Sequence, residues 1–246
     1  MKEVQFVNLI DSLLVAVKNN PKNFCVIQIL SFACTCLYSG KIFIPSLFEI
    51  IKKIIENFML VQKIEDIHPG LVEATAEFLN KSFEHINESY NKIPMFIESL
   101  FIFCRFLNYV KDSQASKQIY LLFNNLISQD ISFPEKELLI HQITSSTIIS
   151  FPSIGRIILN SVANLLSNLI STNQMKAVSG LVDGLNHEQY KSLPHNIKEI
   201  IVKYIIQNQS NQNKIKMILN DIGIYLKGIG DIDRFFSYEI QLFTSK

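Results

Sequence analysis

The sequence lacks an excess of charge of either sign. Lysine and arginine together number 23 and aspartate and glutamate 22, which leaves a formal net charge of +1 over 246 residues. Proteins that attract nucleic acid or an anionic membrane surface carry a pronounced positive charge. The composition therefore indicates no direct nucleic-acid partner.

Cysteine and long apolar runs are also scarce. The apolar stretches at 24–38 and 93–107 are shorter than the ~20 residues that a helix needs to cross a bilayer. All the cysteines fall in apolar runs, which is typical of core residues in a reducing compartment: Cys25, Cys34, Cys36 and Cys104. No secretory signal follows Met1. We therefore expect no membrane insertion and a location inside the cell.

No motif for catalysis or cofactor binding is present. The segment Gly228-Ile229-Gly230 follows a predicted helix instead of opening one, so it predicts a helix C-cap and a turn, not a phosphate site. The histidines are scattered, and Cys34 and Cys36 point to different faces of a helix. We expect no enzymatic activity, no cofactor and no metal.

Proline marks how the chain is organised. Each of the 7 prolines precedes an apolar run of helical spacing, and the first turn of a helix tolerates proline. Expected N-caps are Asp112, Thr172, Asn186 and, in a capping box with Glu135, Ser132. The pattern predicts about eleven helices, with a short helical turn at 187–191: 4–19, 22–38, 46–65, 70–89, 94–110, 113–129, 134–150, 153–171, 173–184, 195–208 and 213–228.

Three consecutive helices at 68–129 show the most regular patterns. The second is apolar almost all round, so we expect it to lie between neighbours, with Phe101 fully enclosed. The third has one apolar stripe, formed by Ala115, Ile119, Leu122, Phe123, Leu126 and Ile127.

When every second predicted helix is taken, each begins about 40 residues after the one before it in that series. This spacing is the period of HEAT repeats. The spacing predicts an all-α fold, an α-α superhelix (a HEAT/armadillo-like solenoid) of about eleven helices in antiparallel pairs. We expect the solenoid to span 1–231 and a short C-terminal tail, 232–246, to cap the last repeat. The tail aromatics either pack onto that end or form a docking patch for a neighbour.

Four glutamates follow one another along the expected outer side of the helix at 70–89: Glu73, Glu77, Glu84 and Glu88. A solvated helix face supported by pairs such as Glu77 with Lys81 is one interpretation. An acidic strip that binds a basic partner segment is the other, and these four residues are the candidate protein-binding site.

The order of the segments resembles the C-terminal part of the importin-β (karyopherin) superfamily, most closely its transportin-SR/importin-13 branch. The resemblance covers about 67–230 and lies in helix-packing patterns without a ligand signature. It includes His68-Pro69-Gly70-Leu71-Val72, Phe96-Ile97-Glu98-Ser99-Leu100-Phe101 and Leu181-Val182-Asp183-Gly184-Leu185.

This resemblance implies a nuclear transport receptor that binds cargo proteins and responds to the Ran GTPase, shuttling between cytoplasm and nucleus. The family's N-terminal Ran-binding repeats have no counterpart in this chain, and the chain is neutral where family members are usually acidic. The alternative is a HEAT-repeat scaffold in vesicle traffic or a signalling assembly. Release of cargo by GTP-bound Ran separates the two.

Overall fold

The computed structural model describes residues 68–86, 96–128 and 135–244, together with Asn8, Ser12, Val15 and Glu56, which are helical. Apart from those four residues, the helices predicted at 4–19, 22–38 and 46–65 lie outside the described residues. So do three of the cysteines and the prolines at 21, 45, 94 and 134. Contacts divide the chain into two compact units, Met1–Phe133 and Pro134–Lys246, and each is described by itself.

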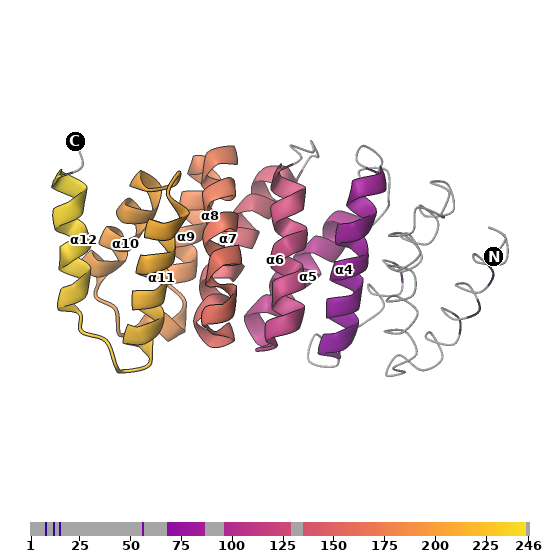
Figure 1. The fold of residues 1–246 in the computed structure, drawn as a ribbon, viewed down its shortest axis with the longest axis horizontal. Coiled ribbons are helices and arrows are strands. Elements are labelled where there is room, and N and C mark those ends of the chain that lie inside the picture. Colours follow the sequence, from indigo (N-terminus) through magenta and orange to yellow (C-terminus); the bar gives the residue numbers. More distant parts are fainter. Residues whose placement is uncertain are drawn as a thin grey trace. The chain divides into compact units, whose positions relative to one another are not determined.

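Nine α-helices and no strands make up the described residues, which confirms the all-α prediction (Figure 1). The first unit contains α4 (Pro69–Ile86), α5 (Phe96–Tyr109) and α6 (Ser113–Ser128). The second unit contains α7 (Lys136–Ile154), η3 (Arg156–Ile158), α8 (Leu159–Thr172), α9 (Gln174–Leu185), η4 (Glu188–Tyr190), α10 (His195–Gln207), α11 (Gln212–Leu226) and α12 (Asp233–Thr244). A helical repeat is consistent with this content; the superhelical arrangement and the total of eleven helices stay predictions.

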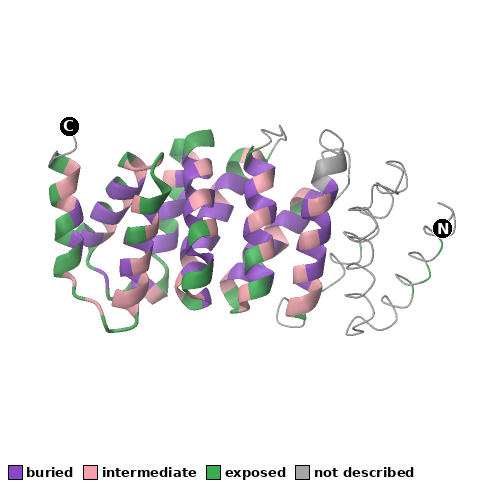
Figure 2. Ribbon diagram, in the orientation of Figure 1, coloured by how far each residue is buried: buried purple, intermediate pink, exposed green. Residues whose placement is uncertain are grey.

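In the first unit, α4 packs against α6 through the stripe predicted from the sequence. All six predicted residues of α6, from Ala115 to Ile127, are buried. A polar contact reinforces the apolar one, because the Asn125 side-chain amide donates to Asn80 Oδ1 at 2.6 Å. In Figure 2 the buried residues form stripes along the helices, as an amphipathic period requires.

The expectation that α5 is enclosed on every side is wrong. Phe103, Cys104 and Phe106 are fully buried, but Phe101 is only half-buried, and Tyr109 is 65% exposed. An apolar side chain shows only that burial would be favourable, whereas a neighbouring helix must be present to provide it. The helix therefore has an inner face and a partly open outer face.

In the second unit, α7 and α9 approach closely because both carry small residues where they meet. A Cβ atom added at Gly180 would lie 2.4 Å from the His141 carbonyl oxygen, and one at Gly184 would lie 2.7 Å from Ile148 Cβ. Opposite them, α7 buries a run of small hydroxyl residues, Thr144, Ser145, Ser146 and Thr147. Helix α8 packs against α11, and α10 packs against α12.

Pro152 contradicts the prediction that every proline precedes a helix. It lies inside α7, which continues to Ile154, and the helix expected at 153–171 begins only at Leu159. Proline has no N–H for the carbonyl of Ile148, four residues earlier. That carbonyl instead accepts a hydrogen bond from Tyr190 Oη at 2.5 Å, and the carbonyl of Ile149 accepts one from Gln189 Nε2 at 2.6 Å. Side chains of η4 thus replace the missing donor and let the helix continue.

The helix ends confirm some local predictions and correct others. Asp112 Oδ1 accepts from the Ala115 N–H at 2.8 Å, which confirms this N-cap. Thr172 and Asn186 are not N-caps, because Thr172 ends α8 and Asn186 follows α9; Asn173 and His187 take those positions. The expected short helical turn at 187–191 is η4. The N-cap position of α7 belongs to Glu135, whose side chain makes no cap hydrogen bond, and Ser132 lies outside the described residues.

Gly228 ends α11 in the conformation that the sequence predicted. Its φ is +74°, a left-handed conformation that glycine adopts at no steric cost. Its N–H donates to the carbonyl of Tyr225 at 2.9 Å, and the N–H of Ile229 donates to that of Ile224 at 3.3 Å. These two bonds form a Schellman motif, which satisfies the last carbonyl groups of the helix.

The C-terminal segment forms α12, the outermost helix of the second unit in Figure 1. Phe235 and Tyr238 are buried on its inner face, whereas Phe236, Ile240 and Phe243 are exposed. Asp221 of α11, only 3% exposed, accepts hydrogen bonds at Oδ2 from Arg234 Nε at 2.6 Å and from Tyr238 Oη. The division into 1–231 and a capping tail stays a prediction. No helix among the described residues is long and apolar enough to span a membrane.

Candidate binding site

The acidic strip is described only in part. Glu73 and Glu77 on α4 are half-buried; Glu84 lies in α4 but its side chain is not described, and Glu88 lies outside the described residues. Burial raises the pKa of Glu73, and the neighbouring carboxylates of Asp112 and Glu77 raise it further. The structure thus places Glu73 beside the N-cap of α6. Binding of a basic partner by this strip stays a prediction.

Two contacts between a histidine and a carboxylate are present among the described residues. His141 Nε2 of α7 lies 2.8 Å from Asp183 Oδ2 of α9, and His195 of α10 lies 3.2 Å from Glu199 on the same helix. No group of three potential ligands in the described part of the chain could hold a metal ion. Cys104, the one cysteine among these residues, is buried.

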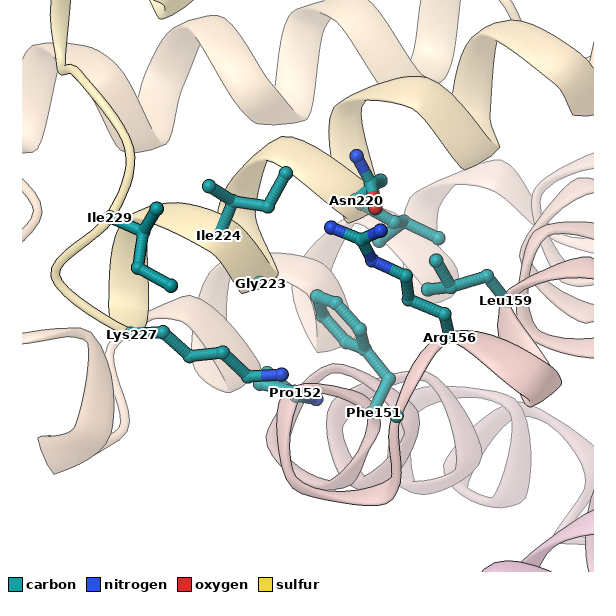
Figure 3. A pocket seen from close by; sticks show the side chains of 11 residues that line it. Phe151, Pro152, Arg156, Leu159, Asn220, Gly223, Ile224, Lys227 and Ile229 are labelled. Atoms are coloured by element: carbon teal, nitrogen blue, oxygen red, sulfur yellow. The ribbon is translucent and has the colours of Figure 1, made fainter.

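A hollow of about 320 Å³ opens between the C-terminal end of α7 and the C-terminal half of α11 (Figure 3). Helix α7 ends at Ile154, and the chain turns at Gly155 into η3. We call this feature the α7–α11 hollow and define it by Phe151, Gly155, Arg156, Asn220, Gly223 and Lys227. Its floor is apolar and consists of the buried residues Phe151, Leu159 and Leu219, and Pro152, Ile224 and Ile229 add further apolar lining.

Two glycines leave space in this hollow, for different reasons. Gly155 has a φ of +97°, so the turn itself requires glycine. Gly223 lies in the helix α11, where glycine destabilises by roughly 0.5–1 kcal/mol relative to alanine. A Cβ atom at Gly223 would meet nothing within 4 Å, in contrast to Gly180 and Gly184. Helix packing therefore does not require glycine at this position, and its absent side chain leaves the hollow open.

Two cations border the α7–α11 hollow. Figure 3 shows Arg156 and Lys227 extending over it, with the ring of Phe151 between their charged ends in this view. Both side chains are exposed, no carboxylate lines the hollow, and neither cation forms an ion pair with a residue that the structure describes. Elsewhere in this unit, Lys176, Lys203 and Arg234 each have a carboxylate within 3.4 Å. The hollow therefore combines apolar surface with uncompensated positive charge.

A second groove, of about 250 Å³, lies between α9 and α10. Val182, Leu185 and Val202 form its apolar part. Its charges are already compensated in part, because Glu199 lies 3.2 Å from His195 and 3.4 Å from Lys203. The groove thus has less net charge to offer a ligand than the α7–α11 hollow.

No protein-family model, curated protein or solved structure matches this chain. The expected relation to nuclear transport receptors therefore stays a prediction from the sequence resemblance.

Sequence reasoning did not find the α7–α11 hollow. Its residues come from two segments about 70 positions apart, 151–159 and 219–229, and α8 and α11 bring these together. Gly223 is the feature of the sequence that could have indicated the hollow, because it interrupts an amphipathic helix away from a turn. Only coordinates could distinguish it from packing glycines such as Gly180.

Proposed function

We propose that this chain is a helical-repeat protein that binds other proteins, and that it acts as a nuclear transport receptor of the importin-β type or as the cargo-binding part of one. The α7–α11 hollow is the observation that carries the protein-binding proposal. It offers a partner an apolar floor and two cations that no described carboxylate neutralises. The transport role rests on the sequence resemblance.

Stacked helix pairs suit this function. Each repeat contacts only its neighbours, so a stack presents a long surface without a single deep active site. Affinity on such surfaces comes from a few buried anchors, while charge complementarity sets the encounter rate and the choice of partner. The hollow offers both features within one small area of the second unit.

The test uses the full-length natural protein, immobilised and supplied with a cell extract. Bound proteins are compared after addition of purified Ran loaded with GTP or with GDP. A transport receptor should lose or gain a defined set of partners only with GTP-loaded Ran. An identical set under both conditions would favour the scaffold alternative, and the absence of any saturable partner would refute protein binding itself.

A further inference from the structure

Resting on the proposed protein-binding function, we propose that the α7–α11 hollow receives an acidic segment of a partner protein, in which an apolar side chain stands next to a carboxylate. The apolar side chain enters the space beside Gly223, over the ring of Phe151. The carboxylate lies between Arg156 and Lys227. This assigns a position and a partner chemistry to the binding site.

The charges determine the sign of the ligand. Arg156 and Lys227 are both cationic at neutral pH, and the residues that line the hollow include no acid. A guanidinium group donates two parallel hydrogen bonds to a carboxylate, and such charge-assisted bonds are about twice as strong as neutral ones. A basic segment would instead place like charges together, which is unfavourable.

The apolar surface indicates a peptide segment and not a free anion. Phe151, Leu159 and Leu219 are buried, but Pro152 and Ile224 are half-buried and line the hollow with apolar surface that a small inorganic anion would leave uncovered. The apolar surface extends to the edge of the hollow, where Ile229 is 78% exposed. Covering that surface requires a ligand longer than one residue. A chain of alternating acidic and apolar residues satisfies both requirements.

Gly223 offers a direct test of the space. A leucine at this position should fill the hollow, since a Cβ atom there meets nothing within 4 Å and leucine favours helix more than glycine. Loss of binding in Gly223→Leu would therefore result from occupied space, and thermal unfolding will verify that the fold persists.

The charge test is the double variant Arg156→Glu/Lys227→Glu. Its control is Lys214→Glu/Lys216→Glu, which makes the same change of net charge in the first turns of α11.

The probe is a labelled peptide of leucine and glutamate, followed by fluorescence anisotropy, with a leucine–glutamine peptide and inorganic phosphate in parallel. We expect the Arg156/Lys227 double variant to weaken binding of the acidic peptide by about tenfold or more, since losing a charge-assisted bond costs over ~1.4 kcal/mol. Gly223→Leu should weaken it to a similar extent because the leucine occupies the space of the peptide's apolar side chain. The Lys214/Lys216 control should bind within about twofold of the wild type, and the glutamine peptide more weakly than the acidic one.

Three results would overturn the proposal. The first is that Gly223→Leu binds the acidic peptide as well as the wild type does. The second is that the Arg156/Lys227 double variant and the Lys214/Lys216 control weaken binding equally. The third is that the acidic peptide does not bind at all, even if phosphate binds. The proposed function is judged separately. If the full-length protein captures its partners and Gly223→Leu captures the same ones equally well, protein binding stands and this assignment of the site fails.

Discussion

The phenol of Tyr190 donates a hydrogen bond to the carbonyl oxygen of Ile148, at 2.5 Å, across the gap that Pro152 opens in helix α7. Both groups are buried. The contact joins η4 to the last turns of α7, so a residue 42 positions after Ile148 stabilises a helix that its own sequence would interrupt.

Tyr190→Phe should leave the Ile148 carbonyl without that donor and lower the free energy of unfolding by about 1–3 kcal/mol. In a Pro152→Ala background the backbone N–H is restored, so the same substitution should cost clearly less. Denaturant unfolding of the two single variants and the double variant measures this coupling. Equal costs in both backgrounds would mean that the proline is not the reason for the contact.

Glycines at two positions should respond to alanine with opposite signs. Gly180→Ala places a Cβ atom 2.4 Å from the His141 carbonyl oxygen and should destabilise the protein by about 1–3 kcal/mol. Gly223→Ala meets no neighbour and should stabilise it by roughly 0.5–1 kcal/mol. Thermal unfolding of the two variants side by side provides the comparison. Destabilisation by Gly223→Ala would show that the hollow is not open in solution.

Phe103 should matter more than Phe101. Phe103 is fully buried, so Phe103→Ala should cost about 3–5 kcal/mol. Phe101 is half-buried and retains solvent contact, so Phe101→Ala should cost about half as much, because less apolar area is removed from water there. Urea unfolding of both variants measures the difference. A reversed order would place the core on the other side of α5.

Tyr238 should anchor α12 through Asp221. Tyr238→Phe removes a hydrogen bond to a buried carboxylate and should cost about 1.5–3 kcal/mol. Burial, together with the bond to Asp221, raises the pKa of Tyr238, so the phenol stays protonated and able to donate at neutral pH. Tyr225→Phe is the control, because its exposed bond to the Ser192 carbonyl at 3.1 Å should contribute less than ~1 kcal/mol. Hydrogen exchange should show faster opening of α12 in Tyr238→Phe alone.

Glu73→Gln should stabilise the first unit at neutral pH. The raised pKa of Glu73 means that the folded protein holds this proton more tightly than the unfolded chain does. Stability from this group is therefore lost as the pH rises through the range above its ordinary pKa of 4.5. Removing the like charge beside Glu77 should contribute about 0.2–0.5 kcal/mol at pH 7 and nothing near pH 4. Urea unfolding of Glu73→Gln and of the wild type at pH 7 and at pH 4 measures this difference, and equal free energies of unfolding at pH 7 would contradict it.

Much of the fold was predictable because it depends on local signals. The apolar stripe of α6, the Asp112 cap and the Gly228 turn each lie within one helix and its ends. The site was not predictable in this way. The sequence pointed to glutamates on α4, whereas the hollow, with two cations that no described carboxylate pairs, lies between segments far apart in the chain.

The sequence by itself determined that the described residues fold into helices, where most of them begin and end, and which face of α6 is buried. Hydrophobic period and capping act within a few residues, so their outcome can be read along the chain. Only the tertiary structure decided that Pro152 stays inside α7, that Phe101 is left half-open and that Gly223 faces empty space. Each of these depends on which neighbour lies opposite, and long-range packing supplies that neighbour.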